Sequence, residues 1–279
     1  MLASFLLSLR EGLEAALIIG IVFGSLQHMR RTELKGVVWL GVLSAVLLSL
    51  VGAVALNLAG AEFDGRAEEL FEGVAMLLAA GLLTWMIFWM RRQGASIQQE
   101  LDADVRQAVF KHGATALFLL AFLAVAREGL ELALFLFAAG VDSNPIQIIS
   151  GALLGLAASA SFGWLLFTST HRLSLKNFFL VTNVLLIIFA AGLVAHAVHE
   201  FNEAGVIPGV VDHVWDINGI LDEKSTVGEI LKALVGYNGN PSLTEVLAYL
   251  GYFIALGLVM KGSKIFSDRY ISARERTKG

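Results

Sequence analysis

Apolar residues run through this chain in seven long stretches, which are separated by shorter polar segments. Each stretch is about 20 residues long, the length that an α-helix needs to cross the hydrocarbon core of a bilayer. The predicted spans cover residues 2–26, 36–58, 69–90, 113–139, 146–168, 177–200 and 243–261. The pattern therefore predicts an all-α polytopic membrane protein with seven transmembrane helices, in which residues 1–279 form a single transmembrane domain.

Composition supports this class and limits the chemistry. Hydrophobic residues make up 57% of the chain and charged residues 16%, values typical of a membrane protein rather than a soluble domain. The lipid bilayer is the expected surroundings, and no nucleic acid is expected as a partner. The chain has no cysteine, so disulfides and thiolate ligands are excluded and a metal must be held by oxygen or imidazole. The start of the chain lacks the basic region of a cleavable signal peptide.

Basic residues between the predicted spans are distributed unequally. Fifteen lysines and arginines follow spans one, three, five and seven, and only Arg66, Lys224 and Lys232 follow the others. Because basic residues accumulate on the cytoplasmic side, this predicts an outside N-terminus and an inside C-terminus.

One pentapeptide interrupts two of the apolar stretches. It reads Arg10-Glu11-Gly12-Leu13-Glu14 in the first span and recurs as Arg127-Glu128-Gly129-Leu130-Glu131 in the fourth. A single charged residue at the centre of a span costs about 2.5–3.5 kcal/mol on insertion scales. Three charges placed twice in the same order therefore indicate a functional site.

Helical geometry places the three charges of each copy on one side. At about 100° per residue, Arg10, Glu11 and Glu14 share a face, and the glycine lets a partner helix come close. If the two copies face each other, four carboxylates and two guanidiniums leave a formal charge of −2. We therefore predict a cation site formed by Glu11, Glu14, Glu128 and Glu131, with Arg10 and Arg127 balancing the charge. An Arg10–Glu14 ion pair is expected to leave Glu11 free; the alternative is a purely structural buried ion-pair network, which is costly to keep.

The predicted orientation makes spans one and four antiparallel, so the chain reads as a 3+3 inverted repeat plus one additional helix. Repeat one covers about 1–92, repeat two about 113–203, an external loop about 201–242, and the seventh helix about 243–261. A weaker sequence similarity relates residues 79–83 in span three to residues 190–194 in span six. Inverted repeats with a polar site at mid-membrane are typical of secondary transporters. The alternative is a chance match of motifs within a helical bundle.

Acidic and imidazole side chains gather at the predicted outer surface. Candidate metal ligands there are Glu68, Glu69 and Glu72 at the start of span three, and His196, His199 and Glu200 at the end of span six. They are predicted to collect an external cation, and the alternative is a solvated acidic loop with ordinary interfacial histidines. In the external loop, residues 227–235 are predicted to form a short helix capped by Ser225 or Thr226. Three roles are open for this loop: a lid, a docking surface for an external partner, or a connector without a further role.

Clustered carboxylates without thiols suit hard cations such as ferric or ferrous iron, manganese, magnesium and calcium. The predicted role is therefore a cation carrier. Three alternatives remain open: a transporter of another divalent cation such as manganese or lead, a membrane di-metal redox protein, and a structural or partner-binding subunit.

The doubled pentapeptide in spans one and four resembles the high-affinity iron permease family, the oxidase-dependent iron transporters of fungi and bacteria. The segment 236–243 is similar to the bacterial branch. The resemblance implies import of Fe(III) or Fe(II) across a bacterial inner membrane, with Glu11, Glu14, Glu128 and Glu131 carrying the ion. It implies a transporter rather than an enzyme, without an organic cofactor. It further implies a separate extracytoplasmic redox or iron-binding protein as partner.

Overall fold

The computed structural model describes residues 1–93, 97–141, 143–168, 175–223 and 225–276, and these contain helices but no strand. The long helices are α1 (Leu2–His28), α2 (Lys35–Glu62), α3 (Arg66–Gln93), α5 (Gly113–Gly140), α6 (Pro145–Thr168), α7 (Leu175–Glu203) and α9 (Leu243–Arg276). The short ones are α4 (Ile97–Gln107), α8 (Thr226–Val235), a 3-10 turn (Thr32–Leu34) and a π-helical turn (Ala108–His112). The all-α prediction is confirmed. Of the basic residues that predict the orientation, Arg172, Lys224 and Lys278 lie outside the described residues.

Each predicted span coincides with one long helix, but the seventh ends later than expected. The apolar stretch ends at residue 261, whereas α9 continues to Arg276. No proline follows residue 243 in the sequence, so nothing in the polar tail interrupts the helix when the apolar run stops. Hydropathy marks the end of the span, not the end of the helix.

Within the residues that the structure describes, five helices are long and apolar enough to cross a membrane by length and composition. They comprise Thr32–Glu62, Arg66–Met90, Pro145–Leu165, Leu180–Glu203 and Leu243–Lys261. The other two predicted spans correspond to α1 and α5, whose apolar sequences contain the charged pentapeptides. These helices have 27 and 28 residues. At 1.5 Å per residue each is about 40 Å long, which exceeds the bilayer core.

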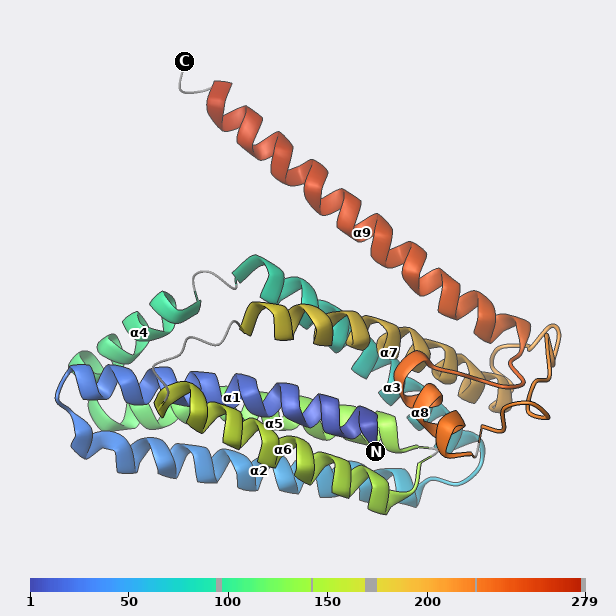
Figure 1. Ribbon diagram of the computed structural model, residues 1–279, viewed down its shortest axis with the longest axis horizontal. Coiled ribbons are helices and arrows are strands. Elements are labelled where there is room, and N and C mark those ends of the chain that lie inside the picture. Colours follow the sequence, from blue (N-terminus) through green and yellow to red (C-terminus); the bar gives the residue numbers. More distant parts are fainter. Residues whose placement is uncertain (94–96, 142, 169–174, 224, 277–279) are drawn as a thin grey trace.

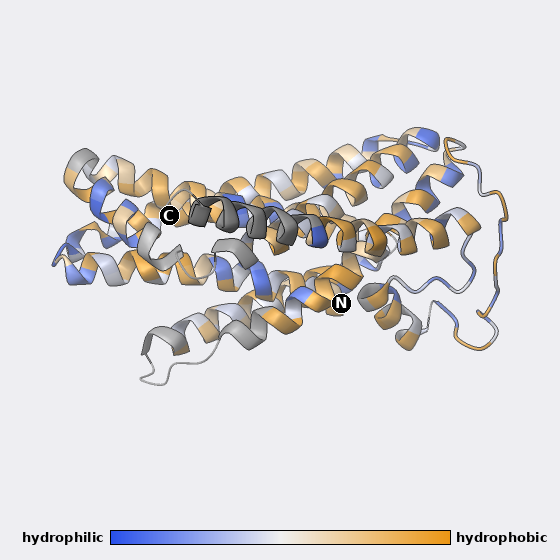
Figure 2. Ribbon diagram, turned by 90° about the horizontal axis from the view of Figure 1, so that it is seen from above, coloured by the Kyte–Doolittle hydropathy of each residue, from blue (hydrophilic) through white to orange (hydrophobic). Residues whose placement is uncertain are grey.

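Successive long helices alternate in direction, and α1, α2, α5 and α6 lie beside the pair formed by α3 and α7 (Figure 1). The far half of α9 extends away from the bundle. In the coloured parts of the long helices most residues are hydrophobic, and many of the hydrophilic ones lie near helix ends (Figure 2). This distribution fits an integral membrane protein.

The two halves of the chain pack on each other crosswise. α1 packs most extensively on α6, and α2 packs on α5. A Cβ atom added at Gly12 in α1 would lie 2.8 Å from the Ser159 Cβ in α6, and one added at Gly129 in α5 would lie 2.7 Å from the Ser49 Cβ in α2. Both motif glycines therefore allow a neighbouring helix to approach closely.

A second pair of glycines makes the same kind of close contact, but here the glycine belongs to the other helix of each pair. Gly41 in α2 lies against Ala121 in α5, and Gly151 in α6 lies against Ser4 in α1. The sequence spacing from Ser4 to Gly12 on α1 equals that from Ala121 to Gly129 on α5. The spacing from Gly151 to Ser159 on α6 likewise equals that from Gly41 to Ser49 on α2. The α1–α6 and α2–α5 interfaces are thus built from corresponding positions of the two halves.

The segment between α7 and α9 carries the predicted short helix. α8 begins after Ser225, whose side-chain oxygen accepts a hydrogen bond of 3.0 Å from the Gly228 amide. It ends at Gly236, which has a left-handed backbone (φ 67°) and meets Gly192 of α7 backbone to backbone. The predicted helix and its Ser225 cap are confirmed, and α8 is fixed against α7.

Candidate metal centre

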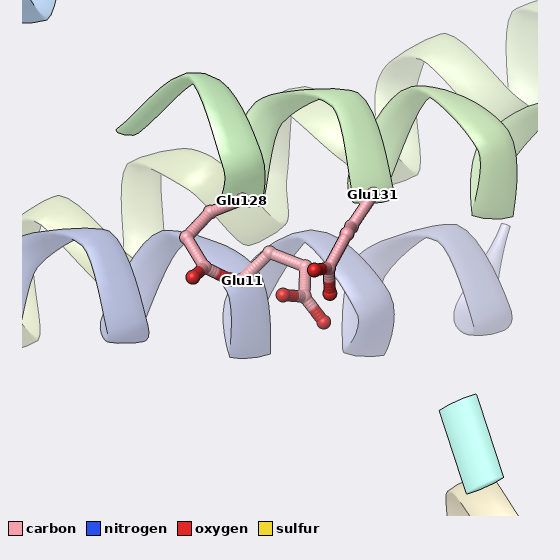
Figure 3. A group of neighbouring side chains, drawn as sticks. All are labelled: Glu11, Glu128 and Glu131. Carbon is pink, nitrogen blue, oxygen red and sulfur yellow. The ribbon is translucent and has the colours of Figure 1, made fainter. Parts of the chain in front are cut away.

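Three glutamates of the repeated motif meet between α1 and α5. Glu11 comes from α1, and Glu128 and Glu131 come from α5, one turn apart. Each offers a carboxylate oxygen that lies within 4.8 Å of the others, and all three residues are buried. Figure 3 shows their carboxyl groups converging in the space between the two helices. The two copies of the motif meet, as predicted, but the fourth predicted ligand, Glu14, does not belong to this group of three, and its role as a ligand stays a prediction.

Each arginine of the motif lies on the glutamates of its own helix. Arg10 contacts Glu11 at 2.7 Å and Glu14 at 2.9 Å. Arg127 contacts Glu131 at 2.8 Å, with Glu128 at 3.9 Å. The Arg10–Glu14 pair was predicted, but the expectation that it leaves Glu11 free is wrong. The guanidinium has two terminal nitrogens and is buried between both carboxylates, so it binds both.

The second carboxylate oxygen of each clustered glutamate has no hydrogen-bond partner within the described residues. These atoms are the Oε2 atoms of Glu11, Glu128 and Glu131, and each is buried. A buried carboxylate oxygen without a donor is costly, and like charges at this separation repel each other. The cluster therefore needs a cation or protons to be stable, and it can supply three oxygen ligands from two helices.

The outer candidates of α3 lie apart from this cluster. Glu68 is exposed, and Glu69 and Glu72 are half-buried in the first two turns of α3. In the described part of the chain, Glu11, Glu128 and Glu131 form the one group of three His, Asp or Glu side chains close enough to share an ion. A direct ligand role for the three α3 residues stays a prediction.

The α7 candidates divide between a cavity and the protein interior. His196 and His199 line a polar cavity of about 480 Å³ with Glu203, Asp212 and Glu245. The His199 ring bridges two of these, with Nδ1 3.0 Å from Glu245 and Nε2 3.3 Å from Glu203. The His196 Nδ1 lies 2.9 Å from the Gly192 carbonyl oxygen. Residues of the segment between α7 and α9 thus close over the two histidines, and the collection of an external cation at this place stays a prediction.

Glu200 is buried and does not line this cavity. Glu245, at the start of α9, was not among the sequence candidates, although it joins α9 to His199 and accepts a 2.6 Å hydrogen bond from Asn238. Its place in the first turn of a helix, after a proline-containing turn, was the available signal.

Sequence reasoning also missed the side chains that α3 supplies beside the arginines. Met86 and Met90 lie 2.9 and 3.0 Å from the Arg10 guanidinium. Trp85 and Trp89 lie under the Arg127 guanidinium, with ring centroids at 5.4 and 5.1 Å. The signal was a Trp-Met pair that recurs four residues later and so places both pairs on one side of α3.

Long apolar helices that bury an acidic cluster between two of them define this protein as an integral membrane protein with an internal carboxylate site. Its sequence matches the Iron permease FTR1 family over residues 1–266, and the chain belongs to that family. The family predicted from the doubled pentapeptide is confirmed.

The chain is 38% identical over 256 residues to the ferrous iron permease EfeU of Escherichia coli O157:H7, an alignment that covers 91% of this chain and 93% of the relative. The same values hold for the ferrous iron permease EfeU of Shigella sonnei (strain Ss046). The ferrous iron permease EfeU of Yersinia pestis is 36% identical, with 91% of each chain covered. No solved structure matches this chain.

Proposed function

We propose that this protein imports iron across a bacterial inner membrane through the carboxylate site between α1 and α5. The observation that carries the proposal is the cluster of Glu11, Glu128 and Glu131, which brings three buried carboxylates within 4.8 Å of one another in an otherwise apolar bundle. The naming of the relatives as ferrous iron permeases supports iron as the cargo.

The charge of the site fits a cation of high charge. The four motif glutamates and two arginines have a formal charge of −2, so a bound iron ion is compensated within the site. Oxygen ligands suit both oxidation states of iron. A membrane potential that is negative inside favours inward movement by about 2.3 kcal/mol per charge for each 100 mV. The net direction is therefore import.

The proposed topology has seven membrane crossings, with α1 and α5 included, an outside N-terminus and an inside C-terminus. The alternating helix directions and the crosswise packing of α1 on α6 and α2 on α5 support a 3+3 inverted repeat. In this topology the cavity lined by His196 and His199 opens on the outer side. Iron delivered there by a separate extracytoplasmic redox or iron-binding protein passes to the motif glutamates and is released inward when the repeats rearrange.

The proposed function predicts net iron uptake by the full chain in proteoliposomes that contain an iron-sensing chelator. Fe(II), kept reduced, and chelated Fe(III) are presented separately, with protein-free liposomes as the control. We expect uptake above the control for at least one oxidation state, increased by an inside-negative potential. Bound iron without uptake contradicts a carrier, and turnover of oxygen without uptake supports a di-metal redox protein instead.

Manganese and lead uptake are measured in the same vesicles. Iron uptake that persists when either ion is present in equal amount supports iron as the cargo. Preferential uptake of manganese or lead overturns the assignment of iron while leaving a transporter in place.

The absence of native cysteine allows the topology to be tested with single thiols. Asp64→Cys, between α2 and α3, and Glu33→Cys, between α1 and α2, place one exposed thiol at each end of the bundle. We expect a membrane-impermeant maleimide to label Asp64→Cys in intact spheroplasts and to label Glu33→Cys only after permeabilisation. The reverse pattern would overturn the proposed orientation.

A further inference from the structure

The Arg10 guanidinium is held by four side chains from two helices. Its terminal nitrogens lie 2.7 Å from a Glu11 oxygen, 2.9 Å from a Glu14 oxygen, 2.9 Å from the Met86 sulfur and 3.0 Å from the Met90 sulfur. The side chain is 0% exposed, and its Nε atom has no partner among the described residues. One cationic group thus fills a space lined by two carboxylates and two thioethers.

Two thioethers are unusual partners for a guanidinium. Arginine makes its strong hydrogen bonds with oxygen acceptors, and a thioether sulfur is only a weak acceptor. The same sulfur is, however, an ordinary ligand for the softer transition-metal ions. Glu11 and Glu14 are three residues apart on α1, and Met86 and Met90 are four apart on α3, so each pair projects from one helix face. The four atoms surround Arg10 as ligands surround a cation.

The second copy of the motif lacks this arrangement. Arg127 is 36% exposed and lies over the rings of Trp85 and Trp89 rather than between sulfur atoms. Both arginines therefore contact the same turns of α3, but Arg10 meets the sulfurs of Met86 and Met90 whereas Arg127 meets the rings of Trp85 and Trp89. The two sides of the site differ in the ligands available to an ion, although their pentapeptides are identical.

We propose that Glu11, Glu14, Met86 and Met90 form a second cation site, which Arg10 occupies in this conformation and which takes a transition-metal ion when the guanidinium moves away. The inference rests on the proposed function and adds the basis of metal selectivity. Glu11 belongs to both sites, so an ion can pass from the oxygen cluster of Glu11, Glu128 and Glu131 to the mixed site without leaving that carboxylate. Calcium and magnesium, which require oxygen ligands, gain nothing from the sulfurs.

Substitution of both methionines by leucine tests this site, because leucine keeps the apolar volume and removes the sulfur. In the reconstituted full chain, Met86→Leu/Met90→Leu is compared with wild type and with Met76→Leu, which removes a buried sulfur from the same helix. Among the described residues, the sulfurs that contact Arg10 are those of Met86 and Met90, not that of Met76. We expect Fe(II) affinity to fall at least roughly tenfold, because removing even a group that only hydrogen-bonds to a metal ligand typically costs ten- to a hundredfold. Inhibition of Fe(II) uptake by Ca²⁺ and Mn²⁺ should strengthen by a similar factor, and Met76→Leu should behave as wild type.

X-ray absorption of the iron-loaded wild-type protein provides a readout that needs no substitution. Sulfur in the iron coordination shell of wild type and Met76→Leu, but not of the double variant, supports the mixed site. A shell of oxygen atoms alone in wild type overturns it, as does unchanged selectivity in a folded double variant. If wild type takes up no iron at all, it is the proposed transport function that fails, and the spectrum still decides whether the sulfurs bind the metal.

Discussion

Replacing Glu128 with glutamine will reduce iron uptake by the reconstituted protein to the rate of protein-free liposomes. The substitution keeps the shape of the side chain but removes one of three converging negative charges. An amide oxygen is a weaker ligand than a carboxylate for a highly charged ion, and the formal charge of the site falls from −2 to −1. The ion then loses both a ligand and the compensation that makes it stable in an apolar bundle.

The variant should remain folded, and that separates loss of function from loss of structure. Because Glu11, Glu128 and Glu131 repel one another when no ion is present, removal of one charge should leave thermal stability without iron equal to that of wild type or above it. Wild type should gain about 2.7 kcal/mol from iron at a hundred times its dissociation constant, and Glu128→Gln should gain almost nothing. Thermal unfolding in detergent with and without iron measures both quantities.

Glu33→Gln is the matched control, because it makes the same change at an exposed glutamate whose ion pair, within the described part of the chain, is with Arg31. It should transport iron and be stabilised by iron as wild type is. Iron uptake at the wild-type rate by a folded Glu128→Gln protein would contradict the carboxylate site. It would favour a structural role for the motif, in which the glutamates are dispensable for transport.

The meeting of Glu11 with Glu128 and Glu131 was predictable because the sequence contains the constraint that creates it. Charged pentapeptides in two apolar helices keep their charges away from lipid when the helices face each other, and the glycine in each motif permits close packing. The helices themselves were predictable for a similar reason, since a bilayer requires every backbone polar group to be bonded within its own segment.

The contribution of α3 could not be predicted in the same way. Met86 and Met90 are apolar residues in an apolar stretch, and hydropathy does not distinguish a methionine that packs in a core from one that contacts an arginine. Only the crossing of α3 over α1 and α5 brings Arg10 to the sulfurs and Arg127 to Trp85 and Trp89. Helix crossing is set by the fit of many side chains, which no local pattern encodes.

The outer candidates show a further limit of spacing arguments. The sequence predicts two groups of candidates at one membrane surface, which are Glu68, Glu69 and Glu72 on α3 and His196 and His199 on α7. The structure instead places the two histidines in a cavity completed by Glu245 and by residues of the segment between α7 and α9. The partners of these two histidines depend on the path of the long segment between α7 and α9. The sequence pattern does not specify that path.

Placing a methyl group on Gly12 will disrupt the site without touching any charge. The new Cβ of Gly12→Ala would overlap the Ser159 side chain, at 2.8 Å from its Cβ and 3.3 Å from a methyl group of Leu156. Serine is too short to move aside, so α1 and α6 must separate, at a cost of about 1–3 kcal/mol for an overpacked interface. Glu11 moves with α1 and leaves Glu128 and Glu131, so iron uptake should fall sharply. Gly24→Ala is the control in the same helix, because among the described residues no atom of another helix lies within 4 Å of the added group, and it should transport iron as wild type does.

The crosswise packing makes this prediction a test of the inverted repeat. Gly12→Ala/Ser159→Gly moves the side-chain bulk from one helix to the other and should restore much of the lost stability and uptake, when compared with Ser159→Gly alone. The corresponding change in the other half, Gly129→Ala/Ser49→Gly, should rescue Gly129→Ala in the same way, because Ser49 meets Gly129 as Ser159 meets Gly12. Rescue in both halves would show that the two interfaces hold the glutamates by one mechanism. Rescue in neither would mean that the motif glycines are needed for something other than close helix packing, such as a change of backbone shape during transport.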